Sequence, residues 1–421
     1  MKKINLIQPI LIIKIFFIFI FLNYVYFSFR LTLRQNSWIT GDWLINYADG
    51  IIRRGLSGEI LIFLSNIFSL NVLYIVIFIQ SILFLLFLIH FLQIIKNKEI
   101  TIWYFFLIFS PLTFLFTFYD PLTVGRKEVI FFLVYTLYIK YFLVLKNNIL
   151  TNFSFLFAGT ILVLLHEIFI FFLFFFLFPK FLSLKLNNKN FNIKIFKNEL
   201  FLILGSIIGI FFLLVFSIGN SDINNLTCQR LVDKGLNENI CDGTIAALNS
   251  FGFSNYIFFN DQFRIFKYIS DYNYIKTYPI YILLFFIPLF QFLKKNNIKK
   301  NIYNYFILFF FIQLIILLPI FIVVNDWGRY LNIFFIFNLI FLSYFVLKKK
   351  DEITFKKPIK NYLFLMPLLI LYATSWHMPH CCQKNFGKGL ISFKDRIYFR
   401  LHNPTNFNDK TREFILKLIN R

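Results

Sequence analysis

LTNFSFLFAGTILVLLHEIFIFFLFFFLFPKFLS, residues 150–183, is an apolar stretch with His166 and Glu167 in its middle. It is too long for one spanning helix, which needs about 20 residues. A His-Glu pair would also be costly at the centre of a bilayer. Two short helices that turn at this pair satisfy both constraints. The stretch therefore predicts two spans, 150–165 and 167–183, in an all-α, multipass integral membrane protein.

Hydropathy along the rest of the chain indicates the same class. The mean hydropathy is +0.71, and 59% of the residues are hydrophobic. We expect a transmembrane domain over residues 1–376, with outer loops 29–71 and 219–276, and an outer-face tail over 377–421. The eleven expected spans are 5–28, 72–95, 101–118, 128–145, 150–165, 167–183, 199–218, 277–293, 303–324, 331–347 and 361–376.

The Lys residues indicate which side is cytoplasmic, because short cytoplasmic loops carry an excess of positive charge. With eleven spans, the N-terminus lies inside, the C-terminus lies outside, and the protein belongs in the cytoplasmic membrane. A single long helix over 150–183 would instead turn Lys294–Lys300 outward. The Lys-rich inner segments are Lys2–Lys3, Lys96, Lys98, Lys146, Lys185–Lys197, Lys294–Lys300 and Lys348–Lys360.

All twelve Arg residues fall on the outer face in this topology. Lys is the default cation of the chain, so Arg at one face suggests a need for the planar fork that grips phosphate or carboxylate. The alternative is that these residues only anchor helices at lipid headgroups. The twelve are Arg30, Arg34, Arg53, Arg54, Arg126, Arg230, Arg264, Arg329, Arg396, Arg400, Arg412 and Arg421.

Charge and cysteines exclude some functions. The net charge of +23 comes mostly from Lys in the inner loops, beside anionic lipid, so nucleic acid is not an expected partner. No GxxxxGKS loop is present, which argues against ATP-driven transport by this chain alone. Cys228 and Cys241 share an outer loop, where an oxidising compartment favours a disulfide. The run His377–Cys382 contains metal-ligand residue types, but its spacing is not a recognised zinc motif, and no metal site is expected there.

A polar motif, GDWLINYADGIIRRGLSGE over residues 41–59, follows the first span. Its spacing predicts an interfacial helix in which Asp42 faces Asn46 and Asp49 faces Arg53. The glycines after the Arg pair let backbone N–H groups approach an anion closely. An ordinary amphipathic juxtamembrane helix with a salt bridge is the alternative.

Four further polar motifs face outward. In 119–128, Arg126 and Lys127 precede a helix N-terminus and so suit a phosphate. His166-Glu167 has the residue types of a general acid or base. The motif 325–330 adds Arg329 to a second Asp-Trp pair, and the loop 222–271 is expected to be a lid over a groove. The alternative for 119–128 is a plain capped turn, and the alternative for His166-Glu167 is a structural His. The alternative for 325–330 is an aromatic belt at the membrane interface.

The pattern Asp42-x-x-x-x-Tyr47-Ala48 after the first span, with about eleven spans and an interfacial outer helix, resembles the multipass GT-C-fold glycosyltransferases. More loosely, the chain resembles O-antigen polymerases and ligases. The chain departs from the GT-C pattern by lacking an Asp-Glu doublet at Asp42 and a Pro-rich segment after Gly55. The resemblance implies that the first-loop acid activates the acceptor and that basic residues hold a lipid phosphate.

The leading hypothesis is a glycosyltransferase, or glycan polymerase, that uses a polyprenyl-phosphate or -diphosphate sugar and a glycan or lipid acceptor. It would act at the outer face in cell-surface polysaccharide assembly, in a glycan-assembly complex or alone. Because Arg can bind the phosphate, the reaction does not strictly need a metal ion, and a divalent cation stays open as a cofactor. Candidate bases are Asp42 first, then Asp49, Asp120, His166 and Glu167; candidate phosphate ligands are Arg53, Arg54, Arg126, Lys127 and Arg329.

Two other functions remain as alternatives. A transporter or flippase for an anionic lipid or solute would place ionisable residues near the midplane of its spans. Here Lys14 and His90 are nearly the only such residues. A non-catalytic scaffold of a polysaccharide-assembly complex is the third possibility.

Overall fold

A computed structural model describes residues 9–48, 50–143, 148–186, 193–216, 223–249, 269–296, 300–347, 360–382 and 387–388. In this part of the chain the regular structure is helical, apart from the paired two-residue strands β1 (Trp376–His377) and β2 (Gly387–Lys388). Seven helices of the described chain are long and apolar enough to cross a membrane. The prediction of an α-helical multipass membrane protein is therefore confirmed.

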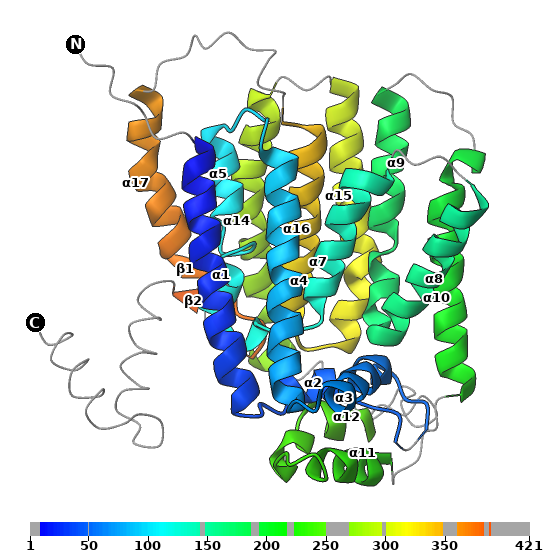
Figure 1. Ribbon diagram of the computed structural model, residues 1–421. Helices are drawn as coiled ribbons and strands as arrows, with labels where there is room; N and C mark the ends of the chain where they lie inside the picture. The colour runs from blue at the N-terminus through cyan, green and yellow to red at the C-terminus, as the bar shows by residue number, and fades with distance from the viewer. Residues whose placement is uncertain are drawn as a thin grey trace, which may run out of the picture.

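The long helices stand side by side as a bundle, and shorter apolar helices complete it (Figure 1). The long segments are α1 (Pro9–Leu33), α4 (Val72–Ile95), η3 (Glu167–Phe172) continued by α9 (Phe174–Leu186), α10 (Lys197–Phe216), α14 (Tyr274–Lys295), α15 (Lys300–Val323) and α16 (Trp327–Phe345). The shorter ones are α5 (Ile102–Ile108), α7 (Glu128–Leu137) continued by the π-helical turn η2 (Tyr138–Phe142), α8 (Ile149–Leu165) and α17 (Lys360–Thr374).

The chain breaks at His166, as the sequence predicts. Helix α8 ends at Leu165, and His166 is extended, with φ −162° and ψ 111°. The next helical turn, η3, starts at Glu167. A single long helix through 150–183 is thus excluded, and the His-Glu pair lies at a helix junction.

The expected span over 101–118 is wrong in detail, because the helix ends early. Helix α5 stops at Ile108, shortly before Pro111, and the residue before a proline is disfavoured in helical geometry. The backbone carbonyls of Leu112 and Thr113 accept hydrogen bonds from Asn332 Nδ2, at 2.8 and 3.0 Å. Non-helical backbone inside a membrane protein needs such internal partners. Two short turns follow, α6 (Phe116–Tyr119) and η1 (Pro121–Thr123).

A single interfacial helix over 41–59 is also wrong. The motif forms α2 (Thr40–Leu44), a non-helical connection, and α3 (Gly55–Phe68). Gly58 N–H donates to Ile45 O at 3.1 Å, and a Cβ at residue 58 would overlap that carbonyl, so the connection folds tightly back on α3. Asp42 and Asn46 therefore do not share a face of one helix, because α2 ends at Leu44, and Asp49, expected to pair with Arg53, lies outside the described residues.

The two ends of the bundle differ in what they carry (Figure 1). Helices α4, α9 and α14 end, and α10 begins, at the upper end in the view. Lys185 of α9, Lys294 of α14 and Lys197 of α10 lie in these terminal turns, and Lys96 caps α4. Helices α2 and α3 lie below the lower end, with α11 (Ile223–Val232) and α12 (Thr244–Asn249) beneath them. This separation agrees with the expected partition of loops between two sides.

The segment containing α11, η5 (Glu238–Cys241) and α12 packs against α2. The predicted Cys228–Cys241 disulfide is present in it. Arg230 holds Glu59 with two hydrogen bonds of 2.7 and 2.9 Å. Most of the rest of the expected lid over 222–271, including Arg264, lies outside the described residues.

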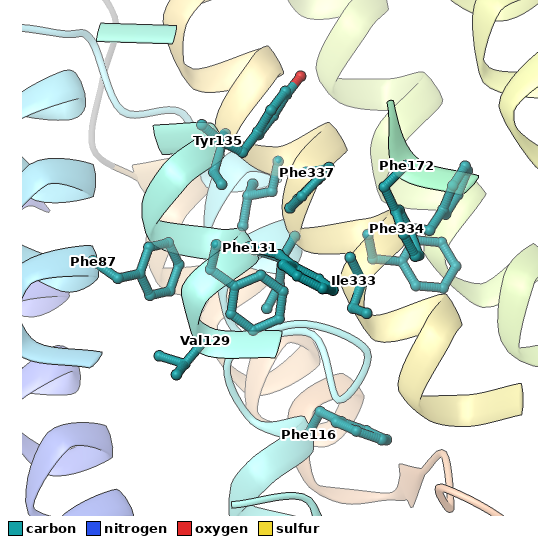
Figure 2. Close-up of a cluster of buried hydrophobic side chains, with 14 of the residues drawn as sticks. Phe87, Phe116, Val129, Phe131, Tyr135, Phe172, Ile333, Phe334 and Phe337 are labelled. Atoms are coloured by element: carbon teal, nitrogen blue, oxygen red, sulfur yellow. The ribbon is translucent and has the colours of Figure 1, made fainter. Parts of the chain in front are cut away.

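An aromatic core fills the bundle above these lower elements (Figure 2). Helix α16 is its centre, and 89% of an apolar 18-residue stretch of this helix is buried. The ring of Tyr135 on α7 stacks on Phe337 of α16 with centroids 4.2 Å apart, and Phe131 of α7 contacts Phe169 of η3. This packing fixes the lower ends of α7, η3 and α16, which carry charged residues.

Helices α8 and α10 pack against each other through small residues. Gly205 and Gly209 on α10 face α8, and Thr160 Oγ1 donates to Gly205 O at 2.9 Å. Small residues four apart let helix backbones approach closely in membranes, where van der Waals packing drives association.

Gly205→Leu is expected to separate these two helices, because a Cβ at residue 205 would overlap the carbonyl oxygen of Leu156. Overpacking of this kind typically costs about 1–3 kcal/mol. Thermal unfolding of the purified protein in detergent measures the loss. Leu204→Ala, at an exposed position of the same helix, is the control and should leave the melting temperature nearly unchanged. An unchanged melting temperature in Gly205→Leu would contradict the packing described here.

Candidate functional site

A cluster of charged side chains lies where α2, the start of α3, the His166 turn and the lower ends of α7 and α16 meet. Its members come from separate parts of the sequence and interact through ion pairs and hydrogen bonds or, for Arg126, through charge–charge interaction alone. They are Asp42, Arg53, Arg54, Arg126, Lys127, Glu128, His166, Glu167, Asp326 and Arg329. We call this set the polar cluster.

Arg54 is the centre of one half of the polar cluster. Its guanidinium forks onto Glu167, with Nε 3.0 and 2.9 Å from the two carboxylate oxygens and Nη2 2.6 Å from Oε1. Its Nη1 lies 3.4 Å from Asp42 Oδ1. Arg54 has φ +63°, a conformation that is uncommon for a residue other than glycine and often marks a functional site. A carboxylate thus occupies the fork that was expected to bind phosphate.

Lys127 is fully buried and ties three segments together. Its ammonium donates to Arg54 O at 3.2 Å and Leu165 O at 3.4 Å, and lies 3.9 Å from Asp42 Oδ1. Burial lowers the pKa of Lys127 to about 8, although Asp42 opposes the shift. Lys127 therefore acts as an internal tie in this conformation, and its ammonium faces no open space.

Asp42 is a carboxylate with one unused oxygen. The residue is 1% exposed, and its Oδ2 has no hydrogen-bond partner among the described residues. Burial acts to raise the pKa of Asp42, but Lys127 and Arg54 outweigh it and hold the pKa well below its ordinary value. Asp42 is therefore ionised at neutral pH, with a free oxygen that can accept a proton.

His166 is the second proton acceptor in the polar cluster. Its Nδ1 lies 3.6 Å from Glu167 Oε2, and its buried Nε2 has no partner among the described residues. Burial, followed by the positive charge of Arg54, lowers the pKa of His166 to about 4. The imidazole is therefore neutral at pH 7 and can act as a base.

Arg329 and Arg126 form the other half of the polar cluster. Arg329 is paired with Glu128 and, at 2.5 Å, with Asp326. Among the described residues, Arg126 donates only to backbone carbonyls, Trp38 O at 2.8 Å and Leu122 O at 3.3 Å. Within the described part of the chain Arg126 has no carboxylate at ion-pair distance, so its guanidinium keeps its capacity to bind an anion.

The two guanidinium groups line one small cavity, together with Glu128, Thr123 and Asn332. Its volume of about 30 Å³ has room for roughly two waters. Positive charges at Arg126 and Arg329 repel each other across this region, and an anion between them would relieve the repulsion. The cavity is thus suited to the oxygens of a phosphate, but a whole phosphate requires side chains to move.

A larger cavity, of about 430 Å³, lies between α9, α10 and α15. Its lining is almost entirely apolar, and it contains no member of the polar cluster. Such a cavity suits a hydrocarbon chain. The lining residues are Phe174, Leu177, Phe178, Phe181, Phe196, Leu200, Tyr305, Leu308, Phe309 and Ile312.

The other expected site residues take lesser places. Asp120 is bound by His380, whose Nδ1 and backbone N lie 2.6 and 2.9 Å from its Oδ2. Arg53 lies 3.7 Å from Glu167 Oε1 at the edge of the polar cluster. Sequence reasoning selected the cations but missed the carboxylates that pair with Arg329. Both carboxylates are neighbours of expected site residues in the sequence, which could have indicated them. Glu128 directly follows Lys127, and Asp326 precedes Arg329 by three residues.

A magnesium-type cation does not fit the polar cluster. Mg²⁺ takes oxygen ligands in an octahedral arrangement. In the described residues, the only group of three acidic, His or Cys residues close enough to share an ion is Asp326, His380 and Cys381. That group includes only Asp326 of the polar cluster, and Glu128 and Glu167 are paired with arginine. The chemistry open to the rest of the polar cluster is therefore proton transfer and anion binding by side chains.

No known protein family, curated protein or solved structure matches this chain. The resemblance to GT-C glycosyltransferases accordingly gains no support from relatives. Roles for the residues of the polar cluster depend on their geometry and chemistry.

The depressed pKa of His166 predicts a pH dependence of stability. Between pH 6.5 and about 4, the unfolded chain carries a proton on this residue that the folded protein does not. The free energy of unfolding should therefore fall as the pH falls through this window, by up to about 1.4 kcal/mol per pH unit. His166→Gln should remove this part of the slope. Thermal unfolding in detergent between pH 7.5 and 5 measures the difference, and identical slopes in both proteins would contradict the assignment.

Proposed function

We propose that this protein is a glycosyltransferase that uses polyprenyl-phosphate or -diphosphate sugars at the outer face of the cytoplasmic membrane. The observation that carries the proposal is the pairing of Asp42, a buried carboxylate with a free oxygen, with Arg126, a buried guanidinium without a carboxylate partner. They interact electrostatically within the same cluster. A proton acceptor beside an anion site is what transfer from a phosphate-linked donor requires.

The membrane orientation supports this location. We infer eleven crossings, with the N-terminus inside and the C-terminus outside, because the Lys-containing helix ends share one side of the bundle (Figure 1). The polar cluster then lies at the opposite, outer side. The Cys228–Cys241 disulfide lies at this side too, which is consistent because an oxidising compartment favours disulfide formation.

The chemistry can be written with each residue in a role. Asp42 Oδ2 accepts the proton of an acceptor hydroxyl, whose oxygen forms a bond to the anomeric carbon of the donor sugar. The bond from that carbon to the phosphate oxygen breaks, and its electron pair leaves with the phosphate. Arg126, with Arg329 beside it, stabilises the negative charge that develops there. Removal of water from the buried cluster strengthens these interactions.

His166 is the reserve base. Its imidazole is neutral at pH 7 and its Nε2 is without a partner among the described residues. Glu167 is less suited, because two arginines bind its carboxylate. Asp42 is preferred over His166 because the GT-C resemblance assigns the base to the first outer loop, and the two cations beside Asp42 keep its carboxylate ionised.

Deletion of the gene tests the proposal in the cells that make the protein. A transferase defect should remove a surface glycan and leave its lipid-linked sugar donor accumulated in the outer leaflet. Wild-type protein should restore the glycan, and Asp42→Asn at matched expression should not. Accumulation in the inner leaflet would instead indicate a flippase, and an unchanged lipid-linked pool would indicate a scaffold.

A further inference from the structure

A second group of chemically distinct ligands lies beside the polar cluster. The candidate ligand atoms of Asp326, His380 and Cys381 lie within 4.8 Å of one another. One ligand precedes α16, and the other two follow β1, more than fifty residues later in the chain. A carboxylate, an imidazole and a thiol therefore converge from distant parts of the sequence.

The surrounding structure holds the His380 segment in place. His380 O accepts a hydrogen bond from Gly328 N at 3.0 Å, which attaches the segment to the start of α16. On its other side, Cys382 N donates to Tyr274 Oη at 2.7 Å. Tyr278 Oη donates to Pro379 O at 3.2 Å. His380 and Cys381 are thus positioned by backbone hydrogen bonds that do not involve their metal-binding atoms.

Asp120 orients the imidazole. Its Oδ2 lies 2.6 Å from His380 Nδ1, and when Nδ1 donates its hydrogen to this carboxylate, Nε2 is the nitrogen that can bind a metal. Metal-bound histidines regularly donate their second nitrogen to a carboxylate in this way. The Asp120–His380 pair therefore has the arrangement of a metal ligand with its supporting carboxylate.

We propose that Asp326, His380 and Cys381 bind a zinc-type divalent cation. Thiolate and imidazole ligands favour Zn²⁺ over Mg²⁺ or Ca²⁺, which take oxygen ligands. Three protein ligands leave one tetrahedral position open to water or another ligand. Asp326 also binds Arg329, so the ion would lie beside the polar cluster. The proposal does not depend on the glycosyltransferase activity.

The cysteines give a second reason. Cys228 and Cys241 form a disulfide, and Cys381 and Cys382 are free thiols beside Tyr274 at the start of α14. In an oxidising compartment free thiols tend to oxidise, and a bound metal protects the thiolate that ligates it. Metal binding would therefore protect Cys381 from oxidation.

Metal analysis of the full-length protein tests the site. The protein is purified in detergent without chelator, equilibrated with Zn²⁺ and passed through a desalting column. We expect one zinc per chain, and Co²⁺ in its place should give a thiolate-to-metal charge-transfer band in the near ultraviolet. Cys381→Ser and His380→Gln should lose the band, and Cys382→Ser, which alters the adjacent exposed thiol, should keep it.

Asp120→Asn supplies a variant that leaves all three ligands intact. Loss of the supporting carboxylate should weaken zinc binding by roughly 10- to 100-fold without abolishing it. Elution volume and the intact Cys228–Cys241 disulfide report that each variant is folded. The proposal is overturned if the wild-type protein holds no stoichiometric metal, if Cys381→Ser retains it, or if mass spectrometry finds a Cys381–Cys382 disulfide in protein purified without reductant.

Discussion

Asp42→Asn should lower the rate of sugar transfer by about 10²- to 10⁴-fold, which is the usual contribution of a general base. The amide keeps the shape of the side chain but cannot take the proton of the acceptor hydroxyl. The effect should fall on the rate of the chemical step and leave donor binding nearly unchanged. A transfer assay in proteoliposomes with saturating donor measures it.

The fold should tolerate this change, since Lys127 can adapt. Burial lowers the pKa of Lys127 to about 8, so loss of the nearby carboxylate lets the ammonium give up its proton instead of remaining as an unpaired buried charge. A melting temperature close to the wild-type value is the control. His166→Gln should retain most of the activity. Full activity in Asp42→Asn, together with loss in His166→Gln, would transfer the role of base to His166.

Arg126→Lys should lower transfer by about 30- to 1000-fold, equivalent to about 2–4 kcal/mol of transition-state stabilisation. Lysine keeps the charge but loses the planar fork, which matters at a phosphate and not at a lipid headgroup. Arg126 is the best of the candidate arginines for this test because no carboxylate of the described chain competes for its guanidinium.

Arg34→Lys is the matched control, because Arg34 is exposed after α1, where headgroup anchoring is the simplest role. It should keep full activity, since Lys reaches the interface equally well. Equal activity in Arg126→Lys and Arg34→Lys would contradict the phosphate role and favour headgroup anchoring for both residues.

Much of the fold is predictable because the bilayer limits what each segment can do. Spanning length and the cost of His166 and Glu167 at mid-bilayer together place a helix break at this pair, and the structure has it there. The Cys228–Cys241 disulfide followed from two cysteines in one outer loop. Both predictions rely on the local sequence and on its surroundings, which are the bilayer for the helix break and an oxidising compartment for the disulfide.

The errors in the fold come from tertiary contacts. Helix α5 ends shortly before Pro111, and the backbone that follows can stay non-helical because Asn332, over 200 residues away, satisfies its carbonyls. The connection between α2 and α3 depends on the close approach of Gly58 to Ile45. Local helical spacing in residues 41–59 could not reveal this approach, so one helix was expected where two exist.

The polar cluster was predictable in its members and not in its pairings. Arg next to Gly and Asp in an apolar chain indicated Arg54, Arg126 and Arg329. Which carboxylate each would meet depends on the fold, as with Arg54 and Glu167, which lie 113 positions apart. Only the structure distinguishes Arg126, which remains available to an anion, from Arg54, which does not.

The most direct test reconstitutes the purified protein in liposomes with lipid-linked sugars and acceptors extracted from the membranes of the cells that make it. Mass spectrometry then follows the lipid-linked sugar and the free polyprenyl phosphate over time. Wild-type protein should consume the donor and release the polyprenyl phosphate or diphosphate, and Asp42→Asn should leave the donor intact. A donor that stays intact with wild-type protein, or one consumed equally by both proteins, would contradict the assignment of sugar transfer to the polar cluster.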